Sequence, residues 1–599
     1  MKVVSVSTLQ HPANDRGWAR WAVVLAGVIP LVALVVAVWR YAVNVLYWDE
    51  WAVATVLPRY HLGRLRWIDL FVQHNESRMV VPRLLILALA NASGGDVRSE
   101  MAATIALACV VSGGVWVLGR RTLPCGAGTR TAIWALANLL IFGLVQHENW
   151  LMGMQLVAEL PVACLVGGLV MATSDRSVAA RFVACMSLAT VSTFSMAHGA
   201  ICWVLLLPAL WVDGARVTTD ERARRVRWTW IYVAVFVSTL LVYFRDYHKP
   251  AGHPGLDEVL RQPASALAYA LSFLGHPLMG IGMPRLGSAI AAGVVSLVVL
   301  VAIVLRIARA SDAPARLHRA APWLVVTAYA LGSAAITTLG RLGFGLEQSL
   351  ESRYTAYSSY LPLAILHLLV IARPPRWASV TVSAWIAIAS VCTSIASLDD
   401  MAQTRMRRLQ AAAVLRMSAV VTRPDEIART LYPNVAQFQR VAAKLEQVGM
   451  MSPPRLADPH LDRIAGETSA DAPSGFVDTV TRGPDGSLDV IGWAVLREDR
   501  RLADAVVLSY DDEQGRPVAF DLTTERKIRD DVAARENWPG YARSGFHVRV
   551  PADATSETRV PTIRAWAFDA ISGKAFPLER SAASPSNAQP TEAASPASG

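Results

Sequence analysis

Long apolar runs recur along the first two thirds of the chain. A membrane helix needs about 20 mostly apolar residues to cross a hydrocarbon core of about 30 Å. The pattern therefore predicts a polytopic α-helical membrane protein with about 11 spans. These lie at roughly 20–45, 99–118, 131–146, 155–173, 178–195, 199–212, 228–244, 284–306, 320–339, 355–372 and 376–397.

One further apolar segment, Met79 to Ala92, is shorter and contains Pro82 and Arg83. Counting it as a span would place the next basic loop, with Arg120 and Arg121, outside the cell and would invert every later loop against the positive-inside rule. We therefore interpret it as a helix along the outer surface, within an external loop at 47–98. The alternative is a short, tilted twelfth span.

The loops rich in arginine all fall on one side of the membrane when the spans are counted in this way, and this sets the orientation of the chain. It predicts a cytoplasmic N-terminus at 1–19, a transmembrane domain at 20–397 and an external C-terminal region. The composition, 53% hydrophobic and 17% charged, agrees with a membrane protein. The net charge of +10 arises from short loops between apolar runs, so we read it as an orientation signal and expect no nucleic-acid partner.

The pattern changes beyond the last span. Residues 398–472 are predicted to form a helical external extension and linker, and 473–580 show short period-two runs bounded by Gly, Pro and Asp turns. Such runs predict an all-β sandwich domain. Its Trp493 and Trp566 lie in apolar strands, which favours core packing over a sugar-stacking surface. Residues 581–599 form a Ser/Ala/Pro tail that we expect to be disordered.

Polar residues gather at the external ends of the predicted spans. The clusters include "WDEW" from Trp48, "QHNESR" from Gln73, "QHENWLMGMQ" from Gln146 and "GRLGFGLEQSLESRY" from Gly340. Ionisable groups near the hydrocarbon boundary cost several kcal/mol unless they are paired or hydrated. Interfacial anchoring would explain any one cluster, but their convergence on one face predicts a polar cavity.

The side chains of these clusters are of the types needed for general-base catalysis and for phosphate binding. Adjacent carboxylates at Asp49 and Glu50 offer a general base, and His74 and Glu76 can tune it. Arg341 and Arg353 offer donors that suit a phosphate. The candidate sugar or acceptor contacts are His74, Asn75, Glu76, His147, Glu148, Asn149 and Gln155. The candidate phosphate contacts are Arg78, Arg341, Arg353 and Tyr354.

The order of these boxes resembles that of the GT-C superfamily of glycosyltransferases over about residues 20–400. Members use polyprenyl-phosphate sugars and keep a catalytic carboxylate in the first external loop. The resemblance implies that Asp49 is the catalytic acidic residue and Glu50 its neighbour. "HNESR" departs from the proline-rich box of the mannosyltransferase relatives. Some members bind a divalent metal at this acid, so the resemblance allows but does not require one with Asp49, His74 and Glu76.

The sequence thus predicts a glycosyltransferase at the outer face of the cytoplasmic membrane. It would move a sugar from a polyprenyl-phosphate donor to a glycan, glycolipid or protein acceptor, with membrane lipid around it. The alternatives are a transporter or flippase of lipid-linked sugars, and an oligosaccharide ligase or polymerase. A transporter should show internal repeats and polar residues near mid-membrane. No convincing repeat is present, which favours the enzyme.

Overall fold

The computed structural model describes residues 17–212, 218–250, 252, 255, 257–280, 285–467, 473–551 and 563–580. Most of the predicted cytoplasmic N-terminus and the predicted tail at 581–599 lie outside these residues. The chain divides into two compact units. Unit 1 comprises Met1–Arg405 and Val441–Ser452, and unit 2 comprises Met406–Arg440 and Pro453–Gly599.

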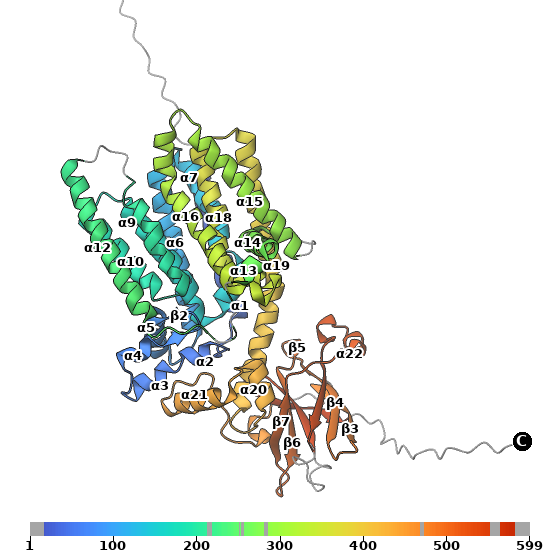
Figure 1. Cartoon of the computed structure of the whole chain (residues 1–599). Coiled ribbons are helices and arrows are strands. Elements are labelled where there is room, and N and C mark those ends of the chain that lie inside the picture. Colours follow the sequence, from blue (N-terminus) through green and yellow to red (C-terminus); the bar gives the residue numbers. More distant parts are fainter. Residues whose placement is uncertain are drawn as a thin grey trace, which may run out of the picture. The chain divides into compact units, whose positions relative to one another are not determined.

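Long apolar helices make up most of unit 1 (Figure 1). Among the described residues, nine helical stretches are long and apolar enough to cross a membrane. Their main helices are α1 (Gly17–Tyr41), α6 (Arg98–Thr122), α7 (Ala127–Ile141), α9 (Leu156–Ala172), α12 (Thr219–Phe244), α15 (Arg285–Ala308), α16 (Ala313–Arg341), α18 (Tyr360–Ala372) and α19 (Arg376–Met417).

The prediction of a polytopic helical membrane protein is therefore confirmed, whereas the count of eleven spans stays a prediction. The two remaining predicted spans fall on shorter apolar helices, α10 (Val178–Thr193) and α11 (Ile201–Ala209). Other short helices of this unit are α8 (His147–Leu151), α13 (Glu258–Arg261), α14 (Pro263–Gly275) and α17 (Thr355–Ser358). Six of the 3₁₀ turns are η1 (Leu144–Gln146), η2 (Gly153–Gln155), η3 (Ala197–Ala200), η4 (His276–Leu278), η5 (Leu342–Phe344) and η6 (Leu346–Leu350).

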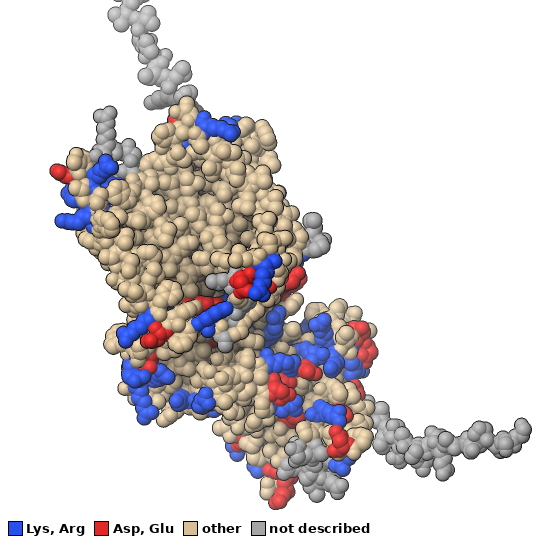
Figure 2. All heavy atoms as spheres, in the orientation of Figure 1, with Lys and Arg blue, Asp and Glu red and all other residues tan. Residues whose placement is uncertain are grey.

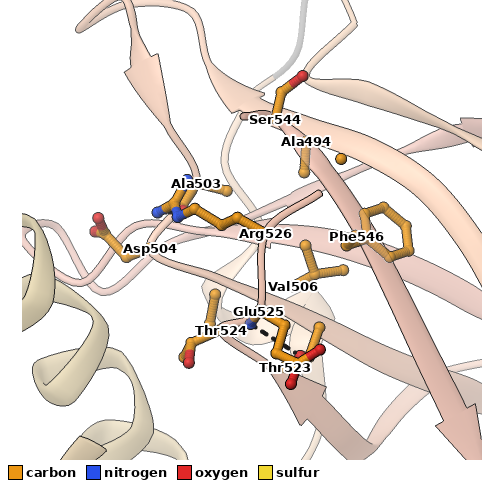
Figure 3. A pocket seen from close by; sticks show the side chains of 12 residues that line it. Ala494, Ala503, Asp504, Val506, Thr523, Thr524, Glu525, Arg526, Ser544 and Phe546 are labelled. Carbon is orange, nitrogen blue, oxygen red and sulfur yellow. Dashed lines mark hydrogen bonds between the residues drawn. The ribbon is translucent and has the colours of Figure 1, made fainter. Parts of the chain in front are cut away.

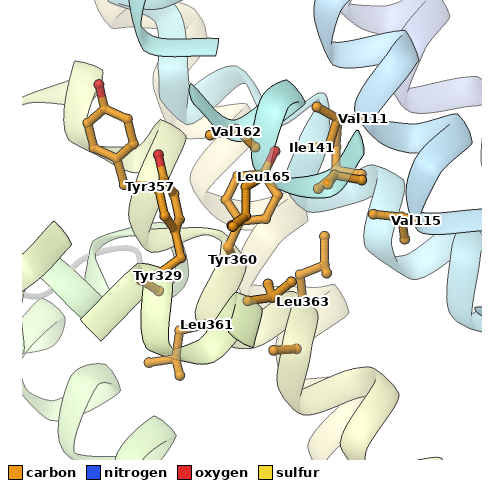
Figure 4. Packing of buried hydrophobic residues seen from close by; sticks show 14 of the residues in the cluster. Val111, Val115, Ile141, Val162, Leu165, Tyr329, Tyr357, Tyr360, Leu361 and Leu363 are labelled. Carbon is orange, nitrogen blue, oxygen red and sulfur yellow. The ribbon is translucent and has the colours of Figure 1, made fainter. Parts of the chain in front are cut away.

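Helix α18 lies inside unit 1, in contact with α7, α15 and α16. In the most apolar 18-residue segment of Ser352–Ala372, 94% is buried inside the protein. The corresponding share for α12 is 17%. A helix that is apolar all round suits either a position among other helices or one in contact with lipid, and the burial of α18 shows that it lies among other helices. Figure 4 shows the packing, in which Leu361 and Leu363 of α18 share a cluster with Val115, Leu165 and other residues of α6, α7, α9 and α16.

Small residues allow two helices of this unit to cross at close range. A Cβ atom added to Gly275 at the end of α14 would lie 1.9 Å from the carbonyl oxygen of Ala289 on α15. One added to Gly293 on α15 would lie 2.0 Å from the carbonyl oxygen of Leu271 on α14. The two backbones are thus in direct contact, as is usual for helix pairs that associate within lipid.

Charged side chains lie mostly at the two ends of unit 1. Figure 2 shows Lys and Arg side chains at the upper end and a broad uncharged belt below them. The connections from α6 to α7, from α15 to α16 and from α18 to α19 lie at this upper end, and α2 to α5 lie at the opposite one (Figure 1). The predicted basic loops and the predicted polar clusters therefore occupy opposite ends of the unit.

The predicted external loop folds into short elements. They are α2 (Glu50–Val53), α3 (Val56–His61), α4 (Trp67–Leu70), a hairpin of β1 (Gln73–His74) and β2 (Ser77–Arg78), and α5 (Val80–Ser93). The buried Arg83 of α5 donates hydrogen bonds to the carbonyl oxygens of Leu70 and Val72. These bonds attach α5 to the end of α4.

Unit 2 contains two β-sheets and short helices. One sheet has the antiparallel order β10 (Ala575–Pro577), β9 (Arg564–Phe568), β6 (Ala505–Asp511), β7 (Pro517–Thr523). In the other, β11 (Glu579–Arg580) runs parallel to β3 (Gly475–Arg482), and β4 (Leu488–Leu496) pairs antiparallel with β3, β5 (Arg501–Leu502) and β8 (Gly545–Val550). The helical elements include α20 (Pro424–Thr430), η8 (Leu461–Ile464), α22 (Asp530–Arg535) and η9 (Pro539–Tyr541). Helix α21 (Val435–Gln447) begins in unit 2 and ends in unit 1.

Buried residues from both sheets form one apolar cluster, which includes Val490 and Phe546 from one sheet and Leu508 and Ala565 from the other. The β-rich C-terminal region is thus as predicted, while its classification as a sandwich stays a prediction. Trp493 and Trp566 are both buried, and the Trp566 indole nitrogen donates a hydrogen bond to Ser509. Their predicted packing inside the region is confirmed.

The length of α5 yields a test of the topology. Its 14 residues rise about 21 Å, less than the hydrocarbon thickness of about 30 Å. We expect single cysteines at the exposed positions Arg64 and Ala92, before and near the end of α5, to react with an impermeant maleimide from the same side of intact cells. A cysteine at Arg176, in the loop after α9, should react only after permeabilisation.

The background for this test replaces the three native cysteines that are not buried, Cys109, Cys125 and Cys392. If α5 crosses the membrane, Arg64→Cys and Ala92→Cys will label from opposite sides.

Candidate functional site

A cavity of about 370 Å³ opens at the end of unit 1 that carries the external loop. Its walls come from the loop around Asp49, from the β1–β2 hairpin, from η2 and η3, and from the ends of α16 and α17. The predicted site residues that line it are Asp49, His74, Asn75, Glu76, Gln155, Arg341, Arg353 and Tyr354. Residues far apart in the sequence are thus brought to one place.

The first wall pairs a carboxylate with an imidazole. An Asp49 carboxylate oxygen lies 3.5 Å from Nε2 of His74, and the Asp49 side chain is about half exposed, at 48%. His74 ends β1, and the hairpin turn follows with Asn75 in the left-handed region at φ 48°. Asn tolerates this conformation better than most residues. The "HNES" sequence thereby forms the tight turn that presents His74 to Asp49.

This contact affects the ionisation of Asp49. The His74 ring, and to a smaller degree the positive charge of Arg353, hold the pKa of the Asp49 carboxyl below its ordinary value of 3.8 against the opposing effect of burial. A lowered pKa means that the carboxylate is ionised over the whole neutral range. Asp49 is therefore available as a proton acceptor.

Two arginines also line the cavity. Arg341, at the end of α16, forms an ion pair at 3.0 Å with Glu76 of the hairpin turn. The Tyr243 hydroxyl donates a hydrogen bond of 2.6 Å to the backbone carbonyl of Glu76 and so fixes this turn. Arg353 has a side chain that is 43% exposed and lies 3.7 Å from Glu351. Its guanidinium also lies over the Tyr354 ring, 5.5 Å from the centroid.

The "QHENW" cluster lies behind Arg353. His147, Glu148 and Asn149 were predicted to contact a sugar, yet none of them lines the cavity. The Glu148 carboxylate accepts a hydrogen bond from the backbone nitrogen of Arg353, and the Asn149 amide donates one to its carbonyl oxygen. These side chains bind the backbone of η7 (Ser352–Tyr354) and hold Arg353 in place.

Glu50 also departs from its predicted role. It is only 2% exposed, and its carboxylate accepts hydrogen bonds from the backbone nitrogens of Tyr47 and Met154. Asp49 and Glu50 are adjacent at the start of α2, where successive side chains point about 100° apart. Only Asp49 lines the cavity, so Glu50 supports the loop and is not positioned as a catalytic group.

Arg78 also lies outside the predicted position. It was predicted to bind phosphate, but it is buried and does not line the cavity. Its guanidinium donates hydrogen bonds to the carbonyl oxygens of Phe71, Tyr243 and Arg245. Arg78 therefore joins the external loop to the end of α12.

Sequence reasoning also missed part of the cavity. His198 of η3 lines it, lies 3.0 Å from the Tyr329 hydroxyl through Nε2, and packs edge-on against Tyr357. The sequence showed a lone histidine near a span end, which is usually structural. Ile336 and Thr337 also line the cavity, but they lie within the apolar run of α16 and gave no local signal.

The residues suggested for a divalent metal do not form a ligand set. Glu76 forms an ion pair with Arg341, so only Asp49 and His74 remain as candidate metal ligands. Across the described part of the chain, no group of three or more His, Cys, Asp or Glu side chains is arranged to hold a metal ion.

Unit 2 contains a much smaller hollow of about 10 Å³, lined by Asp504, Arg526, Ser544 and neighbours (Figure 3). This volume is about that of one water molecule. It cannot hold a substrate, so the cavity in unit 1 is the candidate site.

Comparison with known proteins finds no matching family model and no matching curated protein.

The two possible roles of Arg78 predict different results for Arg78→Ala. The change removes charge-assisted hydrogen bonds worth about 1.5–3 kcal/mol each, so we expect a loss of at least about 3 kcal/mol in stability. Tryptophan fluorescence during heating in detergent should show a clearly lower unfolding temperature. Arg245→Ala serves as the control, because the Arg245 side chain is 84% exposed. An unchanged unfolding temperature together with lost binding of a phosphate ligand would instead favour the phosphate-binding role.

Proposed function

We propose that the protein is a membrane glycosyltransferase of GT-C type that moves a sugar from a polyprenyl-phosphate donor to a glycan, glycolipid or protein acceptor. The observation that carries the proposal is the single cavity lined both by the Asp49–His74 pair and by Arg341 and Arg353. We further propose eleven spans, including α10 and α11, and a sandwich arrangement of the two sheets in unit 2.

The geometry suits displacement of a phosphate leaving group. The Asp49 carboxylate accepts the proton of an acceptor hydroxyl, and that oxygen forms a bond to the anomeric carbon of the sugar. The bond between the anomeric carbon and the phosphate oxygen breaks, and the phosphate leaves with the electron pair. Arg353 stabilises the negative charge that develops on this phosphate.

We propose that the lipid-linked substrate enters the cavity from the lipid phase. Ile336 lines the cavity, yet it is 43% exposed on the surface of α16. Leu339 on the same helix and Phe344 of η5 are also exposed. A polyprenyl chain beside α16 would place its phosphate near Arg341 and Arg353 without moving through water.

The charge of the cavity favours a monophosphate carrier over the diphosphate carriers of ligases and polymerases. Glu76 neutralises Arg341, whereas Arg353 is more accessible. A phosphodiester carries one negative charge and matches one available guanidinium. The transporter alternative is weaker because the ionisable residues of the cavity lie at one end of unit 1.

The assigned base gives a direct prediction. Asp49→Asn keeps the shape of the side chain but cannot accept the proton, and loss of a general base lowers a rate by about 10²–10⁴-fold. We expect this variant, inserted normally, to fail to restore the surface-glycan sugar composition of a strain that lacks the protein. Asp246→Asn is the matched control, because Asp246 lies at the same end with a side chain that is 86% exposed. Full restoration by Asp49→Asn would exclude Asp49 as the base.

The lowered pKa of Asp49 predicts a pH dependence. Because the folded-state pKa lies below 3.8, the base stays ionised until the pH falls through that lowered value. Protonation of Asp49 should therefore not reduce the transfer rate of the purified protein at any pH above about 5, which is roughly one unit above the ordinary pKa of an aspartate.

His74→Leu removes the hydrogen bond and the ring charge that lower this pKa and leaves the burial that raises it. The acid limb of its rate profile should move to higher pH. Superimposable profiles for the two proteins would contradict the role of His74 in holding Asp49 ionised.

A further inference from the structure

Helices α3, α4 and α5 carry an exposed apolar surface next to three arginines. We call this the α4–α5 patch and define it by Tyr60, Trp67, Ile68, Val72, Leu84, Leu85, Arg59, Arg64 and Arg66. Trp67 is 77% exposed and Ile68 is 63% exposed, although both are large and apolar. Single exposed apolar residues are common, but adjacent ones on neighbouring elements mark an interaction surface.

Ion pairs and hydrogen bonds hold the elements of this patch together. The buried Asp69 carboxylate of α4 lies 2.9 Å from the Arg59 guanidinium of α3. Arg83 joins the end of α4 to α5 through the carbonyls of Leu70 and Val72. The patch is therefore a fixed surface.

The hydrogen bonds of Arg78 place this patch at the membrane boundary. Arg78 joins Phe71, the residue after α4, to Tyr243 and Arg245 at the end of α12. Helix α12 is one of the candidate spans, so its last residues lie where the chain leaves the hydrocarbon. Trp67 and Ile68 precede Phe71 by four and three residues, which is about one helical turn.

The charge of the patch is positive. Its three arginines are exposed, whereas Asp69, the one acidic residue between 59 and 69, is buried beneath Arg59 and Arg66. Trp, Tyr and Arg are the residues that favour the lipid head-group region, where aromatic rings and guanidinium groups contact both apolar and polar surroundings.

We propose that the α4–α5 patch binds the anionic phospholipid head groups of the leaflet in which this end of unit 1 lies. The arginines contact lipid phosphates, while Trp67 and Ile68 enter the interface. Each basic side chain near an anionic surface contributes modestly, so three of them together produce a measurable preference for anionic lipid. A protein partner or a second copy of the chain would require no such dependence on lipid charge.

The patch is also connected to the candidate site. The hairpin that carries His74 and Glu76 follows α4 directly and ends at Arg78. Lipid binding by the patch would hold this hairpin at a fixed depth. The proposal itself does not depend on the reaction at the site and holds for any function of the cavity.

The test uses the full chain in nanodiscs of phosphatidylcholine alone or with 30% phosphatidylglycerol. An environment-sensitive fluorophore is attached to Ile68→Cys in a background without Cys109, Cys125 and Cys392. We expect a blue-shifted emission that lipids labelled with a quencher near the head group quench more strongly than lipids labelled deep in the chain. The shift should be larger with phosphatidylglycerol.

The combined change Arg59→Gln, Arg64→Gln and Arg66→Gln should abolish the difference between the two lipid compositions. The matched control neutralises three exposed arginines of unit 2, Arg482, Arg549 and Arg564, and should keep the difference. Emission and iodide quenching equal to those of a label at Arg549→Cys would overturn the proposal. So would a shift that appears only when two copies share a nanodisc.

Discussion

The candidate site depends on one buried guanidinium. Arg78 ends the β1–β2 hairpin and donates hydrogen bonds to backbone carbonyls on both sides of a long sequence gap, at Phe71 and at the end of α12. A buried charge is tolerated only when its donors are satisfied. These bonds therefore couple the packing of the loop to the position of α12, and the residues between β1 and β2 are positioned with them.

At other parts of the cavity, too, a buried polar side chain holds the backbone in place. Glu50 binds the backbone at Tyr47 and Met154, and Glu148 and Asn149 bind the backbone of Arg353. In each case one polar residue anchors the chain, and a neighbour in the sequence or in space presents its side chain to the cavity. Polar residues near a membrane boundary are costly, so each must have a partner or a function.

This division explains what the sequence could predict. Run length and hydrophobicity are strong signals, so the long helices and the polar ends were predictable. Residue type also identified five residues that line the cavity, Asp49, His74, Glu76, Arg341 and Arg353.

Residue type alone could not show that Glu50 and Arg78 point to backbone groups, because that depends on the tertiary fold. The position of His198 in the cavity wall was not predictable either, because it depends on contacts with Tyr329 on a distant helix.

The ion pair between Glu76 and Arg341 has a consequence for any anionic ligand. A phosphate that binds Arg341 must compete with a carboxylate that is already 3.0 Å away, whereas one that binds Arg353 meets a weaker competitor at 3.7 Å. Both pairs are partly exposed, so water screens them and neither is strong. For the phosphate ligand that we propose, Arg353 would then be the first contact. Glu76 would limit the total positive charge and disfavour a ligand with several negative charges. The hairpin that presents His74 to Asp49 also carries this carboxylate, so in the proposed reaction the orientation of the base and the selectivity for the anion would depend on the same turn.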